Sequence, residues 1–134
     1  MAHVRRAITR RNTAMNVTPN DKAGTIYSEA VVIDGLNVSN WESPAVFKSL
    51  QDGGVTAINA TVATWDNFLE TMGHIAAWPS RFKRYHETLV QARSVQDILQ
   101  AKKDGKVGVV LGFQNASPIE NDLDRLALFH ELGV

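Results

Sequence analysis

Apolar residues in this chain form short β-branched runs and longer stretches in which they recur at helical spacing. Each β-branched run is bounded by glycine on one side, as expected where a strand gives way to a turn. On this basis the sequence predicts three strands, at residues 31–34, 55–61 and 106–113. The third run is apolar along nearly all of its length, which is typical of a parallel strand covered on both faces.

Stretches with apolar residues at helical spacing lie between these strands. Pro44 at a first helical position and Gly53 at the end predict a short helix between the first two strands. Thr64 is the predicted cap of the next helix, and Pro79 is expected to break or kink it. The apolar face of that helix is predicted to consist of Trp65, Phe68, Leu69, Met72, Ile75 and Ala76.

Three more helical segments follow along the chain. The first covers residues 81–93, with aromatic and apolar side chains on one side. The second begins at a capping box formed by Ser94 and Asp97, and the third begins at Ser117 with its own capping box. Gly133 is the predicted end of the last helix.

The alternation of strands and helices predicts an α/β fold whose parallel strands are joined by right-handed crossovers. Three strands make up only part of an eight-stranded (β/α)8 TIM barrel. We therefore expect residues 25–134 to be the amino-terminal part of a barrel domain, incomplete at its carboxyl end. Residues 1–24 hold five basic side chains against one acidic, and they predict a disordered, solvated extension.

The composition excludes several classes of function. The 134 residues carry 14 basic and 14 acidic side chains, and this balance argues against a general nucleic-acid binder. The absence of cysteine excludes disulfides, thiolate metal sites and a cysteine nucleophile. No apolar run approaches the ~20 residues of a membrane span, and the basic start lacks the apolar segment of a secretory signal. We therefore expect a cytoplasmic protein.

Polar residues that follow the strands are the candidate binding residues. Asp34 and Gly35 break the first apolar run, so Asn37 follows the carboxyl end of that strand. Open α/β sheets and barrels place their chemistry at such ends. Gln114 and Asn115 follow the third strand in the same way. These residues either line a substrate pocket or support the turns in which they lie.

Other candidate groups have simpler interpretations. Trp41 either floors the pocket or packs under a loop. Acids at 120, 122 and 124 lack the remaining residues of a calcium loop, and no phosphate-binding glycine loop or nucleophile elbow is found. The histidines show no spacing typical of metal ligands, and the last three are interpreted as ordinary helix-surface residues. The four histidines of the chain are His3, His74, His86 and His130.

Several segments, in order, resemble the renal (membrane) dipeptidase family of metal-dependent amidohydrolase barrels that cleave dipeptides. Residues 34–41, Asp-Gly-Leu-Asn-Val-Ser-Asn-Trp, resemble the family's opening D-G-H-N-D-x-x-W. Gly53-Gly54-Val55 then leads into the second strand. Residues 106–134 resemble the family's strand that ends in a metal-bridging Glu, followed by a helix that ends in E-L-G-V. The resemblance covers residues 31–134, which is roughly a third of a full enzyme.

The resemblance implies a (β/α)8 barrel with a dinuclear zinc site and a small dipeptide-like substrate. It also implies metal-ligand positions at Leu36, Val38 and Gln114, where the family has His, Asp and Glu. Leu and Val have no lone pair and the Gln amide is neutral, so only Gln114 could coordinate a metal. We therefore expect no metal in this chain alone, and one zinc ion if further ligands follow Val134.

Two hypotheses of different class stay open. In the first, the chain is part of a zinc-dependent dipeptidase that acts on a dipeptide or related amide, and it is inactive by itself. In the second, the apolar side chains at two ligand positions mark a non-catalytic barrel relative used for binding or assembly. A homodimer is compatible with both. A nucleotide-binding α/β domain is a third idea, which rests on the parallel strands alone.

Overall fold

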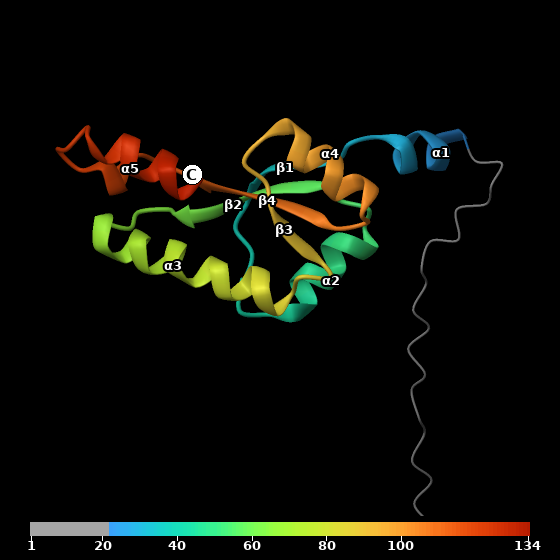
Figure 1. Ribbon diagram of the computed structural model, residues 1–134, viewed down its shortest axis with the longest axis horizontal. Helices are drawn as coiled ribbons and strands as arrows, with labels where there is room; N and C mark the ends of the chain where they lie inside the picture. The colour runs from blue at the N-terminus through green and yellow to red at the C-terminus, as the bar shows by residue number, and fades with distance from the viewer. Residues whose placement is uncertain (1–21) are drawn as a thin grey trace, which may run out of the picture.

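The computed structural model describes residues 22–134 (Figure 1). The strands in this range are β1 (Ile33–Asn37), β2 (Ala57–Ala63), β3 (Leu89–Gln91) and β4 (Val107–Phe113). The helices are α1 (Lys22–Glu29), α2 (Pro44–Asp52), α3 (Phe68–Arg84), α4 (Val95–Lys103), the 3₁₀ helix η1 (Ser117–Ile119) and α5 (Arg125–Leu132). No helix within the described range is long and apolar enough to cross a membrane. The extension predicted at residues 1–24 lies outside that range, except for its last three residues, which begin α1.

The strands of the described range run parallel, in the order β1-β2-β4-β3. The chain passes from β2 through α3 to β3 at the edge of the sheet, and then returns through α4 to β4. Because parallel crossovers are right-handed, this reversal places α4 on one face of the sheet and α2 and α3 on the other (Figure 1). The predicted α/β fold with parallel strands is confirmed.

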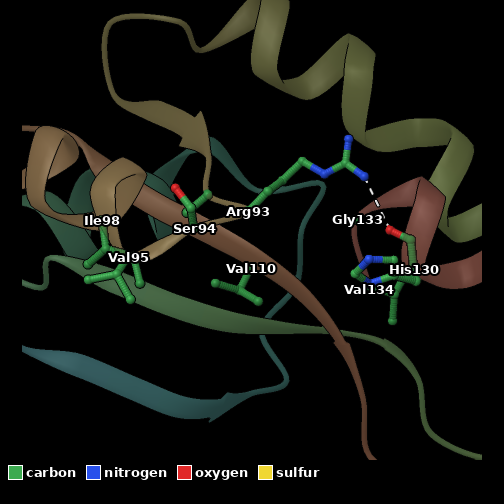
Figure 2. Close-up of a pocket in the computed structure, with 9 residues that line it drawn as sticks. Arg93, Ser94, Val95, Ile98, Val110, His130, Gly133 and Val134 are labelled. Atoms are coloured by element: carbon green, nitrogen blue, oxygen red, sulfur yellow. Dashed lines mark hydrogen bonds between the residues drawn. The ribbon is translucent and has the colours of Figure 1, made fainter.

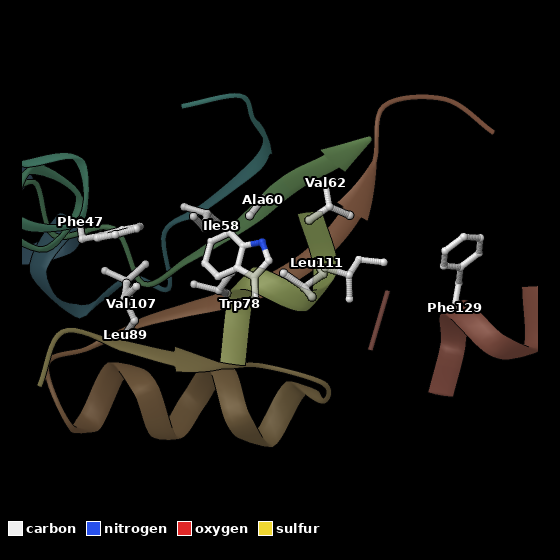
Figure 3. Packing of buried hydrophobic residues seen from close by; sticks show 11 residues of the cluster. Phe47, Ile58, Ala60, Val62, Trp78, Leu89, Val107, Leu111 and Phe129 are labelled. Carbon is white, nitrogen blue, oxygen red and sulfur yellow. The ribbon is translucent and has the colours of Figure 1, made fainter. Parts of the chain in front are cut away.

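The core lies between the sheet and the helices α2 and α3 (Figure 3). Alternate residues of β2 point into it, and Ile58, Ala60 and Val62 are each at most 2% exposed. Phe47 of α2 and Trp78 of α3 cover these residues, and each is 1% exposed. This packing holds the loops that follow β1 and β2 against one another.

The opposite face of the sheet is covered by α4 near the amino-terminal ends of the strands. A Cβ atom on Gly108 would lie 3.4–3.6 Å from the Cβ atoms of Ala57, Ala92 and Ala101. These small residues therefore let α4 lie close to β2 and β4. Further along the same face, β2 contributes Asn59 and Thr61, which face in the same direction as Ala57 because side chains alternate along a strand.

The structure has one strand more than the sequence predicted, because residues 81–93 are not helical throughout. The helix α3 continues through Pro79, which is exposed, and ends before Tyr85. The chain then forms β3, where Val107 N donates to Thr88 O at 2.8 Å in the parallel pairing with β4. Pairing with a distant strand thus overrides the local helical pattern.

The first strand also differs from its prediction at residues 31–34. It begins at Ile33 and extends to Asn37, so that Gly35 lies inside β1 rather than ending it. The pairing with β2 shifts register between Asp34 and Asn37, as in a β-bulge. A β-branched run suits a buried strand, but Ile33 is 54% exposed, because β1 is an edge strand of the sheet in the described range.

The start of α3 was predicted three residues too early. Asn67, not Thr64, caps the helix, and its side chain forms a capping box with Glu70 in which both hydrogen bonds are 3.0 Å long. Trp65 lies before the helix and is 84% exposed, and Leu69 is 78% exposed. Ala76 is exposed as well, so three of the six members of the predicted apolar face are not in the core.

Most of the other predicted helix boundaries agree with the structure, and α2 begins at Pro44 and ends before Gly53 as predicted. The side chain of Ser94 caps α4, and Gly133 ends α5 with a left-handed φ of 89°. The predicted capping box of Ser117 does not form, because the chain makes only a short 3₁₀ turn there. It then breaks at Glu120, whose φ is 51°, and α5 begins at Arg125.

Candidate functional site

The carboxyl ends of the parallel strands β1, β2 and β4 lie along one edge of the sheet, perpendicular to the strands. The predicted site residues lie there. Asn37 ends β1 on one side of β2. Gln114 follows β4 on the other side, and its backbone N–H donates to Ala63 O at the end of β2 with a length of 2.8 Å. Asn115 comes next in the chain. The structure therefore brings all three predicted residues to the same edge of the sheet.

Asn37 supports the bulge in β1. Its Nδ2 donates to Asp34 Oδ2 at 2.8 Å, while the backbone N–H of Leu36 donates to Asp34 Oδ1 at 3.1 Å. The Oδ1 of Asn37 is buried and has no partner among residues 22–134. The turn-supporting interpretation of Asn37 thus describes its observed contacts, and a binding role for its remaining oxygen stays a prediction.

Asn115 fastens the loop after β4 to the loop after β2. Its Nδ2 donates to the carbonyl oxygen of Thr64, and its Oδ1 accepts the backbone N–H of Ser117 at 2.7 Å. Ser117 Oγ in turn donates to Asp66 O at 2.9 Å. Gln114 differs from Asn115 because it is exposed, at the carboxyl end of β4. Its side chain is therefore the one that solvent or a ligand can reach, although its binding role stays a prediction.

Glu120 joins the same loop to two helices. Its Oε1 accepts the backbone N–H of Phe68 at 3.1 Å, and its Oε2 lies 2.5 Å from Arg125 Nη1. The Arg125 guanidinium, followed by the Phe68 amide, holds the pKa of Glu120 below its ordinary value. The charged form of Glu120 thus helps to hold η1 and α5 against the start of α3.

The variant Glu120→Gln is expected to be less stable than the native chain at neutral pH, but not in acid. A carboxyl whose pKa is lowered by folding stabilises the folded state above its unfolded pKa, and this contribution disappears as the pH falls through its folded pKa. Urea unfolding at a series of pH values should therefore show the two stabilities converging below the ordinary value of 4.5. A difference that stayed constant through this range would contradict the role assigned to the charge.

The residues at the three ligand positions do not fit a metal ion. Leu36 and Val38 are 51% and 62% exposed, and their side chains offer no donor atom. Gln114 offers a neutral amide oxygen, which cannot offset the charge of a cation. Within residues 22–134, no three His, Asp or Glu side chains gather in an arrangement that could hold a metal ion.

A groove of about 450 Å³ lies beside this edge, between the loop that follows β1 and the helix α3. Residues 38–42 form one wall, residues 74–81 of α3 form the other, and the end of β2 at residues 61–64 forms the floor. Sequence reasoning did not identify this groove. Its walls come from separate parts of the chain and meet only in the folded state.

Two contacts hold the walls of the groove in place. Trp41 Nε1 donates to Thr61 O at 3.3 Å, which fastens the loop to β2. Glu42 and Arg81 form an ion pair that joins the loop to α3. The ring of Trp41 lies 5.4 Å from that of Trp78, so Trp41 both lines the groove and packs on the core.

His74 and Asp66 lie at the other end of the groove. The sequence placed His74 on a helix surface, and it is indeed on α3, but its Nδ1 lies 2.9 Å from Val62 O. The same nitrogen lies 3.7 Å from Asp66 Oδ1. Asp66 Oδ2 accepts the backbone N–H of Thr64 at 2.8 Å, a local contact across one residue.

A second cavity, of about 510 Å³, lies between the start of α4 and the end of α5 (Figure 2). Arg93 Nη2 donates to the carbonyl oxygens of His130 and Glu131 at 3.2 and 2.6 Å, so its charge sits at the carboxyl end of α5. The Arg93 amide, followed by the Ser94 hydroxyl, holds the pKa of Asp97 below its ordinary value. Both charged groups thus have partners in the fold, and we assign this cavity a structural role.

Comparison with solved structures defines the class of protein. The chain is 34% identical to an amidohydrolase from Pseudomonas aeruginosa, with a TM-score of 0.79, over 83% of its own length and 34% of that chain. The probable dipeptidase PvdM from the same organism is 13% identical, with a TM-score of 0.71 over 84% of this chain and 35% of its own. Dipeptidase AC, a metallopeptidase of family M19, is 18% identical, with a TM-score of 0.61 over 78% and 40%. The fold is therefore that of part of an amidohydrolase-type barrel, as predicted.

The family follows from the sequence itself. The profile of the membrane dipeptidase family, peptidase family M19, matches residues 37–134. The chain belongs to this family, which confirms the resemblance seen in its motifs. No curated protein matches the chain. The chain spans only about a third of the length of the first two solved structures above.

Proposed function

We propose that these residues are part of a hydrolase that cleaves a dipeptide or a related amide. The observation that carries this proposal is the family match over residues 37–134, which includes both the strand ends and the loops that follow them. In this proposal the chain contributes one wall of the substrate site. The exposed amide of Gln114 is the group proposed to hydrogen-bond the substrate, while Asn37 and Asn115 hold the turns beside it.

We further propose that the chain by itself is inactive. The side chains at Leu36, Val38 and Gln114 do not fit a metal ion, so no step of the reaction is assigned to a metal held by these residues. Zinc enters the proposal only as one ion bound by residues of a longer chain. A cytoplasmic location and a homodimer stay predictions.

The second candidate is a non-catalytic relative that uses the same barrel for binding or assembly. The apolar character of Leu36 and Val38 favours this candidate, because apolar side chains at two ligand positions disfavour a cation there. The two side chains are 51% and 62% exposed. Metal content and turnover distinguish the two candidates. A longer chain read from the same gene is expected to bind zinc and to hydrolyse dipeptides in a chelator-sensitive way under the first candidate. A longer chain that is folded, free of metal and inert would support the second.

The apolar ligand positions can be tested in the chain itself. The native chain is expected to retain no zinc after dialysis and to hydrolyse no dipeptide. The triple variant Leu36→His, Val38→Asp, Gln114→Glu supplies the three donors that the family has there, and it is expected to bind one zinc ion without gaining activity. Metal analysis and competition with a chromogenic chelator measure this binding. Stoichiometric zinc in the native chain would contradict the prediction.

A further inference from the structure

Asp66 is a partly buried carboxylate at the end of the groove, and one of its oxygens has no hydrogen bond in the described range. Its side chain is 27% exposed, and Oδ2 accepts the backbone N–H of Thr64 at 2.8 Å. Within the described range, the basic side chain recorded beside Oδ1 is that of His74, whose Nδ1 is 3.7 Å away and beyond hydrogen-bond distance. A carboxylate oxygen that has no hydrogen bond can accept one from a charged donor, and such bonds are stronger than those between neutral groups.

The ring of His74 carries a second nitrogen that can accept a hydrogen bond. Its Nδ1 lies 2.9 Å from the carbonyl oxygen of Val62, which can only accept, so Nδ1 carries the proton. In the neutral ring, Nε2 therefore carries the lone pair. The side chain is 54% exposed and lines the groove, so its second nitrogen is open to a ligand.

The other charges of the groove are already compensated. Glu42 pairs with Arg81 at the opposite end, and the Arg81 guanidinium lies 5.3 Å from the centre of the Trp78 ring. Among the described residues that line the groove, Asp66 is thus the one carboxylate that no guanidinium or ammonium group pairs. The two ends are seven residues apart on α3, or about 10 Å along a helix. The wall between them includes the apolar side chains of Val38, Trp41 and Ala77.

We propose that this groove binds a small organic cation, whose ammonium group donates to Asp66 Oδ1 and His74 Nε2 and whose apolar body packs on the wall between Trp41 and Ala77. A volume of about 450 Å³ is in the range of small-molecule sites, which are mostly apolar with a few fixed polar groups. The two acceptors lie on α3 and on the loop before it. The binding site therefore does not depend on the hydrolytic function proposed above.

Titration of the full chain with phenethylammonium tests this proposal. Two-dimensional NMR spectra are expected to show saturable shifts of the His74 ring and of the amides at residues 61–66 and 74–81. Phenylethanol has the same ring without the charge and is expected to bind at least about tenfold more weakly, since a charge-assisted hydrogen bond is lost. Equal binding of the amine and the alcohol would overturn the proposal, as would an absence of shifts in the groove.

Two variants remove the proposed acceptors but keep the hydrogen bonds that these residues make within the fold. Asp66→Asn keeps an oxygen for the Thr64 amide and removes the charge, and it is expected to weaken amine binding about tenfold or more. His74→Asn keeps a donor for Val62 O and removes Nε2, and it is expected to weaken binding by a smaller factor. Asp97→Asn makes the same change of charge at the start of α4, away from the groove, and is the control, with unchanged binding expected. Amine binding that Asp66→Asn leaves unchanged would refute the assignment.

Discussion

The Trp78→Ala variant is expected to lose about 3–5 kcal/mol of its free energy of unfolding. Trp78 is 1% exposed and lies in the core between α3 and the sheet (Figure 3). Its ring centre lies 5.4 Å from that of Trp41 and 5.4 Å from that of Phe82, so its removal leaves a cavity between α3 and the β1–α2 loop. Because Trp41 also holds that loop on β2, the groove should loosen as well.

Trp65→Ala is the matched control for this prediction. It removes the same type of side chain from a position that is 84% exposed, and the expected change is within about 0.5 kcal/mol. Urea unfolding followed by circular dichroism measures both variants on the same scale. Equal effects of the two substitutions would show that burial of Trp78 does not decide the stability of the core.

The parts of the fold that the sequence predicted well have strong local signals. The second and third predicted strands agree with β2 and β4 to within two residues, because apolar and β-branched residues together fill nearly all of each run. Ser94 caps α4 through a hydrogen bond to the backbone of Asp97, a contact within one turn of chain. Gly133 adopts the left-handed φ that ends α5. Each of these features depends on neighbours in the sequence.

At the start of α3, the helical spacing of apolar residues was recognised, but the helix was predicted to begin too early. Asp66 binds the backbone N–H of Thr64, so the chain is still turning at Trp65. The helix begins only after Asn67, whose capping box with Glu70 has the same sequence signature that was recognised at Ser94. Trp65 was therefore counted into a helix that it precedes.

The remaining errors come from contacts between distant parts of the chain. β3 is three residues long, and its pairing with β4 is what makes it a strand. The break at Glu120 follows its contacts with Phe68 and Arg125, which replace the capping contact expected with Ser117. The candidate groove also depends on contacts between distant parts of the chain. The contact between His74 and Val62 O cannot be derived from the spacing of histidines, because it depends on how α3 lies on β2.

Gly112→Ala is expected to destabilise the chain by about 1–3 kcal/mol, because it overpacks the interface between two central strands. A Cβ atom built on Gly112 lies 2.7 Å from Asn59 Cγ and overlaps its carboxamide. Gly108→Ala, in the same strand, places its Cβ 3.4–3.6 Å from three alanines, which is ordinary contact distance. It is expected to change stability by less than Gly112→Ala, and urea unfolding of both variants checks the difference.

The double variant Gly112→Ala, Asn59→Ala tests whether the carboxamide is the cause. Asn59 Oδ1 is buried without a partner in the described range, so its removal sacrifices no hydrogen bond seen there. The alanine side chain leaves room for the new methyl group on β4. The two substitutions should therefore be coupled by about 0.5–3 kcal/mol, with the double variant more stable than the sum of the single effects predicts. Additive effects would instead place the strain of Gly112→Ala in the backbone of β4.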